Sequence, residues 1–522
     1  MEVVYRESFV GKLLFRYKRK LESETLDGSF AANSTTSSTT KNWDQKGKTK
    51  IIIDWNGVSD PANPQNWPFL AKLLVTFELS LLQIAVYMCT AIYTPGVDQI
   101  MEEFQIGHTL SMLPLTTFVI GYGIGTMFFS PLSEDPRIGR TNVYIVTLFF
   151  YVVLQIPIAL SRNISQLSGL RFAAGVFAST PLAVIGASFS DIFDFKYMPL
   201  SMGIWGIVSF AGPSMGPFFG SILVVKGGWR WAFWFTLILS GICFFVLILF
   251  LPETNGDAIL YQKYKCIKAR YEYQDFDIKC SAFHVLPRSF DEAITEIIWR
   301  PIIITLEEPV VLLINLYTSL VYAVLYLWFE LFPIVYLEVH HFSLIQMGAT
   351  YLSFVCGVVL GVIPYLYYLY INYTQKFIRK EEVYPEVFIP TSIAGNILMT
   401  AGIFLVGWTS SPKIHWFVPL IGAALFGASE VINFQSLLNY LGMSFPRYMA
   451  SAFASNNLIR SSVGGVFPLF GRNLYKNLST REFPVGWGSS VLGFISLLMC
   501  SIPILFYANG KKLRAASRYS GL

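Results

Sequence analysis

Charged residues are scarce in this chain. Of its 522 residues only 14% are Asp, Glu, Lys or Arg, whereas 54% are hydrophobic. A soluble domain of this size does not bury so large an apolar fraction in one core. The composition therefore excludes an ordinary soluble protein and indicates a protein that crosses a membrane several times.

Metal-binding and disulfide-forming patterns are lacking as well. The cysteines and histidines show no zinc-ligand spacing, no disulfide framework and no metalloprotease motif. They are Cys89, Cys243, Cys266, Cys280, Cys356, Cys500, His108, His284, His340, His341 and His415. We therefore expect no metal, no cofactor and no enzymatic activity.

Signals for nucleotides, nucleic acids and secretion are weak. Gly47, Lys48 and Thr49 match the end of a phosphate-binding loop, but Asn42 stands where that motif requires glycine. The net charge of +5 is small, and no basic stripe accompanies a nucleic-acid recognition motif. Residues 1–30 are charged and lack an apolar core. We expect no nucleotide-driven pump, no nucleic-acid partner and no cleavable signal peptide.

Long apolar runs, in contrast, fill most of the chain. Twelve of them approach the roughly twenty residues that a helix needs to cross a bilayer. They form two groups of six, at 70–92, 109–130, 141–160, 166–189, 197–222 and 230–251, and at 309–336, 346–371, 386–408, 415–440, 447–470 and 485–507. We therefore expect an all-α polytopic membrane protein with an N-terminal tail (1–69), a first six-helix bundle (70–251), a central loop (252–308), a second bundle (309–507) and a C-terminal tail (508–522).

The basic residues indicate the orientation of these helices. Lys and Arg are frequent in the N-terminal tail, in the central loop and at the C-terminus, and less frequent in most of the loops between them; the last outer loop is an exception. Because such residues favour the cytosolic side, we place both termini and the central loop in the cytosol. Within the tail, residues 21–50 are Ser/Thr-rich and polar, and we expect them to be disordered. Asn163 and Asn477 then stand in N-x-Ser sequons on outer loops, as candidate glycosylation sites.

A glycine- and proline-rich run lies inside the fifth apolar segment. It reads GIWGIVSFAGPSMGPFFGS, from Gly203 to Ser221, and its two Gly-Pro pairs are Gly212-Pro213 and Gly216-Pro217, followed by Gly220. Small residues let helices in lipid pack closely, so a packing face alone explains the glycines. The run also resembles the antiporter motif of the fifth span in drug:proton antiporters of the major facilitator superfamily, which is thought to seal the outer end of the pore.

Two further stretches resemble one branch of that superfamily. DWNGVSDPANPQNWP precedes the first span at residues 54–68, and LPET closes the sixth span at residues 251–254. Both are similar to the fungal twelve-span drug:proton antiporters of the benomyl and fluconazole resistance type. The resemblance covers nearly the whole chain from Asp54 and implies the major facilitator fold, in which two six-helix bundles surround a central cavity.

Charged residues at the loop after the second span form a candidate conformational latch. The sequence SPLSEDPRIGR contains Glu134, Asp135 and Arg140. Acid and base at a helix end can tie neighbouring helices together, although a turn with ordinary topological charges would look the same. The stretch resembles the loop between spans two and three of the superfamily, shifted in spacing, so either carboxylate is a candidate partner of Arg140.

Ionisable residues inside apolar segments are costly and therefore mark functional positions. Arg171 lies in RFAAG of the fourth span, which resembles a superfamily motif implicated in proton transfer. Arginine does not deprotonate, so Arg171 would act by changing the proton affinity of a carboxylate partner. Asp191, at the end of the same span, is a proton-coupling candidate or a solvated helix cap.

The second group of spans contains the other candidates. Glu330 lies beside aromatic residues before Pro333 and is the first choice for proton coupling, with a water-exposed acid at the outer interface as the alternative. Glu430 and Arg460 form either an ion pair or a second proton site. Aromatic and polar residues suited to a substrate wall are Tyr317, Tyr322, Phe434 and Gln435.

The resemblance implies a proton-coupled antiporter that exports lipophilic drugs across the plasma membrane. Its partners would be small lipophilic molecules, protons and the lipid bilayer, and we expect a monomer driven by the proton gradient. Two alternatives stay open from the residues alone. One is a proton-coupled carrier of polyamines or another narrow metabolite, and the other is a transporter-like sensor that binds without transport.

Overall fold

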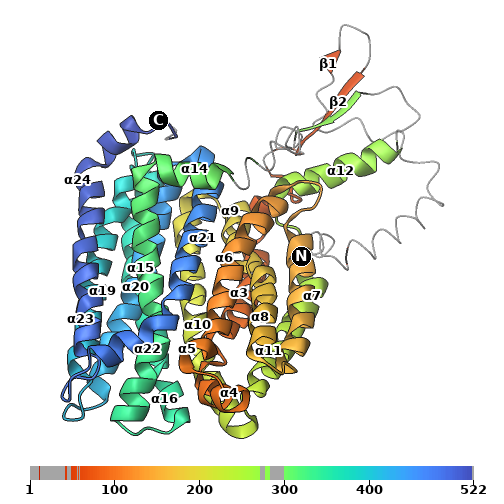
Figure 1. The fold of residues 1–522 in the computed structure, drawn as a ribbon. Coiled ribbons are helices and arrows are strands. Elements are labelled where there is room, and N and C mark those ends of the chain that lie inside the picture. Colours follow the sequence, from red (N-terminus) through yellow and green to blue (C-terminus); the bar gives the residue numbers. More distant parts are fainter. Residues whose placement is uncertain are drawn as a thin grey trace.

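The computed structural model describes residues 11, 42–43, 49–55, 57, 59–270, 277–281, 295 and 299–519. Within this part of the chain, long helices lie side by side and upright (Figure 1). The predicted disordered segment 21–50 lies largely outside the described residues, and so does most of the segment that resembles a phosphate-binding loop. We call the end of the helices that carries α12 (Gly256–Arg270) the loop end, and the end that carries α4 (Val97–Phe104) and α16 (Leu344–Thr350) the opposite end.

The first group of helices corresponds to the first six apolar runs. Proline in the first turn favours the start of α10, and Gly228, with φ of +82°, ends it in a conformation that other residues rarely adopt. The bounds are α3 (Phe69–Ala91), α4 (Val97–Phe104), α5 (His108–Ser111), α6 (Leu113–Glu134), α7 (Arg140–Ala159), α8 (Ile164–Ala178), α9 (Thr180–Ile192), α10 (Met198–Gly227) and α11 (Arg230–Phe250). Helices α8 and α9 together form the fourth membrane span.

The second group repeats this arrangement. Helix α15 continues into a π-helical segment that begins at Pro333, because proline removes a backbone hydrogen bond there. The bounds are α15 (Pro309–Phe332), η6 (Pro333–Val339), α16 (Leu344–Thr350), α17 (Leu352–Leu369), η7 (Tyr370–Gln375), α18 (Lys376–Ile378), η8 (Pro385–Phe388), α19 (Ile389–Thr409), α20 (Phe417–Ser444), α21 (Met449–Val466), α22 (Pro468–Asn477), α23 (Gly486–Met499) and α24 (Ser501–Ala516).

Eleven helical stretches of the described residues are long and apolar enough to cross a membrane. Helix α21 is the twelfth helix of the predicted pattern, and it is less apolar because its sequence SNNLIRSS carries polar residues. Those side chains are buried within the protein, since α21 packs between α6 of the first group and α15 of the second. The prediction of twelve membrane helices in two groups of six is therefore confirmed in its architecture.

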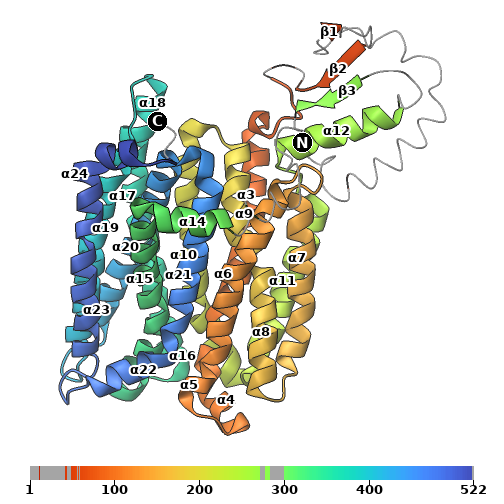
Figure 2. The same cartoon turned by 45° about the horizontal axis from the view of Figure 1, so that its top comes forward.

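A small three-stranded sheet accompanies the helices without changing the predicted all-α class. Strands β1 (Asn42–Trp43) and β2 (Thr49–Ile53) are antiparallel, and β2 pairs in parallel with β3 (Asp277–Cys280). The run of three isoleucines in β2 suits a strand. The sheet lies beside α12 (Gly256–Arg270) at the loop end and joins the predicted N-terminal tail to the predicted central loop (Figure 2). The central loop also contains α14 (Arg300–Glu307).

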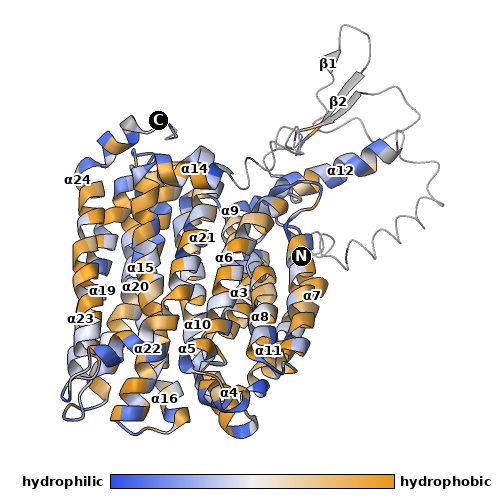
Figure 3. Ribbon diagram, viewed as in Figure 1, coloured by the Kyte–Doolittle hydropathy of each residue, from blue (hydrophilic) through white to orange (hydrophobic). Residues whose placement is uncertain are grey.

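The two groups meet where α6 packs against α21 and where α10 packs against α16, α17 and α20. Glycine permits the close approach, because a Cβ atom at Gly123 would lie 2.8 Å from the Cβ of Ser461. Hydrophobic residues also predominate along most of the helices (Figure 3). Phe77, Phe245 and Leu498 are 66%, 65% and 74% exposed. This is the arrangement of a protein whose outer surface faces lipid.

Candidate functional site

An aromatic cluster fills the middle of the contact between the two groups. Phe210 of α10 lies 5.1 Å from Phe434 of α20 and 6.4 Å from Tyr322 of α15, measured between ring centroids. Trp205 of α10 lies 6.3 Å from Phe434. At most 6% of each of these side chains is exposed. Two of the predicted substrate-wall residues, Tyr322 and Phe434, therefore meet first-group aromatics in a closed site.

Arg460 of α21 occupies the ring faces of this cluster. Its guanidinium carbon lies 4.1 Å from the Tyr322 centroid and 4.5 Å from the Phe434 centroid, which is cation–π geometry. Nη2 donates a hydrogen bond of 2.8 Å to Oδ1 of Asn457. Within the described part of the chain, Nε and Nη1 have no hydrogen-bond partner. The site thus contains a buried cation whose hydrogen-bonding capacity is only partly used.

The predicted ion pair between Glu430 and Arg460 is not formed. No nitrogen of Arg460 lies within 4.0 Å of the Glu430 carboxylate, and both carboxylate oxygens lack a hydrogen-bond partner among the residues that the structure describes. Glu430 is completely buried on α20, one helical turn before Phe434. The physical reason is that Arg460 is turned toward the two rings and Asn457 instead of toward the acid.

The other two predicted wall residues lie in different surroundings. Tyr317 donates a hydrogen bond of 2.8 Å from its hydroxyl to Oδ1 of Asn396 on α19, so it faces the interior of the second group and not the contact between groups. This corrects its prediction as a wall residue of a central site. Gln435 lies against α10, where a Cβ atom at Gly206 would be 2.7 Å from its Nε2.

Glu330 lies near the opposite end and pairs across the two groups. Its Oε2 is 3.3 Å from Nε2 of His108, the first residue of α5. Glu330 is 2% exposed and His108 is 19% exposed, so the acid is buried beneath a histidine that reaches the surface. The alternative of a water-exposed acid at the interface does not fit this burial. Sequence reasoning missed His108, for which the only available signal was an ionisable residue at the start of a span.

Arg171 corrects a second expectation, because no carboxylate in the described ranges lies within 4 Å of it. Instead it donates to the backbone carbonyls of Cys89 (2.9 Å), Thr90 (2.8 Å) and Pro114 (3.3 Å). The two residues of α3 stand in its last turn, where carbonyls have no partner within the helix. Arg171 is also 4.5 Å from the ring of Phe118. It therefore fastens α8 to α3 and α6 in this conformation.

The charged cluster at the loop end has other members than predicted. Arg140 donates to both oxygens of Asp191, at 2.6 and 3.2 Å. Glu253 of the LPET stretch, to which the sequence analysis assigned no role in this cluster, accepts a hydrogen bond of 3.0 Å from the backbone N–H of Arg140. Within the described residues neither Glu134 nor Asp135 forms a direct ion pair with Arg140, although Glu134 is near enough to interact with it electrostatically. A latch role for these two acids stays a prediction. Asp191 is bound to Arg140 and is not a free helix cap.

A matching cluster, also missed by sequence reasoning, lies at the same end of the second group. Arg514 of α24 forms a two-pronged ion pair with Glu386 of η8. The only sequence signal for this ion pair was that an acid, Glu386, precedes one membrane span and a base, Arg514, stands near the end of another helix. In both clusters a glycine lies against the acid: Gly139 beside Glu253 and Gly510 beside Glu386.

The glycine- and proline-rich run forms a continuous part of α10 through Pro213 and Pro217. Gly212, Gly216 and Gly220 lie on one face, the first two against the end of α3 and Gly220 against Ile92 and Pro95 just beyond it. A Cβ atom at Gly212 would be 2.7 Å from the Cβ of Tyr87, and one at Gly216 would be 2.6 Å from the carbonyl oxygen of Met88. The predicted close-packing face is therefore present, and a sealing role for it stays a prediction.

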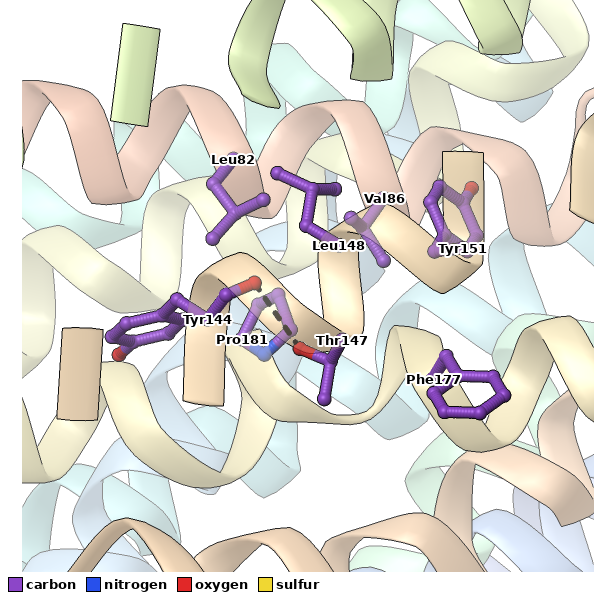
Figure 4. Close-up of a pocket in the computed structure, with 8 residues that line it drawn as sticks. All are labelled: Leu82, Val86, Tyr144, Thr147, Leu148, Tyr151, Phe177 and Pro181. Atoms are coloured by element: carbon purple, nitrogen blue, oxygen red, sulfur yellow. Dashed lines mark hydrogen bonds between the residues drawn. The ribbon is translucent and has the colours of Figure 1, made fainter. Parts of the chain in front are cut away.

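Apart from this contact region, a small crevice lies inside the first group (Figure 4). It lies between α3, α7, α8 and α9 and leaves no space for a water-sized molecule, so no drug-sized ligand fits there in this conformation. Its lining residues are Leu82, Val86, Tyr144, Thr147, Leu148, Tyr151, Phe177 and Pro181, none of which was predicted to bind substrate. The two sequon residues, Asn163 and Asn477, are exposed, and their glycosylation stays a prediction.

Two groups of membrane-spanning helices that meet around a buried site of aromatic and charged residues are typical of a membrane transporter. The sequence profile of the Major Facilitator Superfamily matches residues 79–468, and the chain belongs to this family. A solved structure of the xylose transporter XylE from E. coli, partially occluded and inward open, shares the fold with a TM-score of 0.57 and 14% identity. The match covers 84% of this chain and 98% of that one.

More similar relatives are fungal. The chain is 46% identical to the "Cycloheximide resistance protein" of Candida maltosa, over 99% of this chain and 98% of that protein. It is 39% identical to "Fluconazole resistance protein 1" of Saccharomyces cerevisiae, over 90% of this chain and 85% of that protein. These similarities cover nearly the whole chain and both helix groups.

Proposed function

We propose that this protein is a proton-coupled antiporter that exports lipophilic drugs across the plasma membrane, with both termini and the loop end in the cytosol. The observation that carries the proposal is the closed cluster of Trp205, Phe210, Tyr322 and Phe434 between the two groups. Rings from both groups offer flat apolar surface, which suits planar lipophilic molecules better than sugars. The names of the cycloheximide and fluconazole resistance relatives agree with such substrates.

Transport follows from the position of this cluster. Because it lies where the groups meet, rocking one group against the other would expose it first to one side of the membrane and then to the other. The pair of Glu330 and His108 joins the groups at the opposite end, which we assign to the outside. The protein works as a monomer in this scheme, with protons as the energy source and without a catalytic residue or cofactor.

A polyamine carrier fits the site less well. Polyamines carry several positive charges and require several acids. Among the described residues of the cluster, Glu430 is the only acid, and Arg460 places a positive charge beside it. A flux measurement distinguishes a transporter from a sensor that binds the drug without moving it across the membrane.

The experiment uses purified protein in proteoliposomes with an acidic interior and radiolabelled cycloheximide outside. Protein inserted with its loop end outward should concentrate the drug inside as protons leave, and a protonophore should abolish the accumulation. Tyr322→Ala should lose transport, whereas Tyr317→Phe, which changes a tyrosine outside the cluster, should keep it. Binding without accumulation would favour the sensor, and accumulation that ignores the gradient would contradict proton coupling.

A further inference from the structure

We infer that Arg460 is an internal competitor of the drug, held on the aromatic rings when Glu430 carries a proton and withdrawn from them when Glu430 is ionised. The inference rests on the proposed function and adds to it the pair of residues that makes drug and proton exclude one another. Three observations carry it: the stacking of Arg460, the unpaired carboxyl of Glu430, and the position of both beside the rings.

The first observation concerns space. The guanidinium lies over Tyr322 and Phe434 at 4.1 and 4.5 Å, on faces that a planar drug would use. Phe210 covers the same rings from the first group. A drug therefore cannot stack on these two faces until the guanidinium leaves them. Arg460 is completely buried and has free donors at Nε and Nη1, so it is able to take a second partner.

The second observation concerns charge. Glu430 is 0% exposed, and neither carboxylate oxygen accepts a hydrogen bond from any described residue. An ionised carboxylate in such a place would be strongly destabilised, whereas a protonated carboxyl group is neutral. The arrangement is therefore the one expected for the protonated state. Loss of that proton leaves a buried negative charge, for which a buried guanidinium is the natural partner.

The third observation concerns neighbours. Helix α20 carries Glu430 and Phe434 one turn apart, and both face α15 and α21. The ionisable groups near Glu430 and Arg460 are Tyr322 and Tyr326 of α15 and Tyr87 of α3. In the described residues around Glu430, Arg460 is the one charged group that interacts with it. Pairing with Glu430 is therefore the available route by which Arg460 leaves the rings.

Together these steps give a complete exchange cycle. On the cytosolic side the proton leaves Glu430, Arg460 moves to the carboxylate, and the drug stacks on Tyr322 and Phe434. On the outer side a proton binds Glu430, Arg460 returns to the rings, and the drug is released. One proton enters for each drug that leaves, and the same two rings cannot hold the drug and the guanidinium at once.

The first test measures equilibrium binding of radiolabelled cycloheximide to purified protein between acidic and mildly alkaline pH. In the wild type the dissociation constant should rise as pH falls, approaching about tenfold per pH unit where Glu430 is mostly protonated. Glu430→Gln keeps the shape of the acid but not its charge. This variant should bind weakly at every pH, and tight binding by it would overturn the inference.

The second test measures exchange of labelled for unlabelled cycloheximide across proteoliposomes without a pH gradient. Glu430→Gln should lose exchange, and the added change Arg460→Gln should restore it, because the competitor is then gone. Arg460→Gln alone should exchange drug but not accumulate it against a gradient. The matched control is Glu330→Gln, which Arg460→Gln should not rescue, since Glu330 pairs with His108 and not with Arg460.

The outcomes separate this inference from the proposed function. Gradient-driven accumulation by Glu430→Gln would overturn the role of Glu430 while leaving proton antiport intact. A folded double variant that exchanges no more drug than Glu430→Gln would show that the stacked arginine is only structural. If the double variant does not fold, the pH dependence of binding in Glu430→Gln decides alone. A wild type that neither exchanges nor accumulates drug would refute the proposed function itself.

Discussion

At the loop end, each helix group joins its helix ends through an ion pair. The base precedes the acid along the chain in the first group, and the acid precedes the base in the second. In the first group a base begins α7, one acid lies in the last turn of α9 and a second acid follows α11, as Arg140, Asp191 and Glu253. In the second group the acid precedes α19 and the base lies in α24, as Glu386 and Arg514. In the first cluster the Arg140 side chain binds Asp191, while Glu253 accepts hydrogen bonds from the backbone N–H groups of Arg140 and Thr141. In the second, Glu386 binds the side chain of Arg514. Both tie helix ends together, but the first cluster adds backbone hydrogen bonds that do not depend on its arginine side chain.

Replacing the two arginines should produce the largest effects. Arg140→Ala leaves Asp191 without its cation, and removal of one partner from a buried pair costs about 3–5 kcal/mol. Glu253 keeps its hydrogen bonds to the backbone N–H groups in this variant. Arg514→Ala is the matched variant, and it should cost at least as much because the Arg514 side chain is 2% exposed and that of Arg140 is 7% exposed. Thermal unfolding of the detergent-purified proteins checks this order, and a clearly larger loss for Arg140→Ala would contradict it.

The glycines beside the acids offer a second matched pair. Gly139→Ala adds a Cβ atom against Glu253 and also forces alanine to adopt φ of +77°, which costs about 1–2 kcal/mol by itself. Gly510→Ala meets Glu386 in the same way, but it lies within α24, where alanine favours the helix by about 1 kcal/mol. The melting temperature should therefore fall further for Gly139→Ala. A greater fall for Gly510→Ala would contradict the assigned backbone strain.

The contact between the groups should respond in a different way. His108→Ala removes the partner of Glu330 across the groups but leaves each group intact, so it should loosen the opposite end with little loss of stability. Ser221 is buried there, next to Gly348 of α16. In protein freed of its natural cysteines, a cysteine at Ser221→Cys should react faster with a membrane-impermeant thiol reagent when His108→Ala is present. The same change at His415→Ala, a histidine not placed in this contact, serves as the control.

The smallest effects are expected at the two acids that were predicted for the latch. Neither Glu134→Gln nor Asp135→Asn removes a direct ion pair with Arg140, so each should reduce stability less than Asp191→Asn does. Asp191→Asn removes a two-pronged partner of Arg140 and should cost clearly more. Chemical unfolding of the three variants measures the order. A loss at Glu134→Gln as large as that at Asp191→Asn would support the predicted latch.

The fold was predictable because its signals are long and repeated. Twelve apolar runs and the distribution of basic residues require no knowledge of contacts, whereas α21 is recognisable only by its place in the pattern of six and six. The small sheet was missed because β2 and β3 are more than two hundred residues apart in the sequence. Pairing over such a distance leaves no local signal.

The sequence indicated which ionisable residues belong to the site, but it did not indicate which groups they contact. Arg171, Glu330, Glu430 and Arg460 stood out because ionisable residues are costly among apolar ones. Their partners were not predictable, because Arg171 uses backbone carbonyls and Arg460 uses aromatic rings, neither of which has a charge to mark it. His108 and Glu253 lie at the ends of helices, where ionisable residues are common and carry little information.

The most direct test of the account is accumulation of radiolabelled cycloheximide in proteoliposomes with an acidic interior, compared with the same vesicles after addition of a protonophore. The account predicts concentration of the drug inside only while the gradient exists, and loss of that accumulation in Tyr322→Ala. Equal uptake with and without the gradient, or tight binding with no uptake, would contradict it.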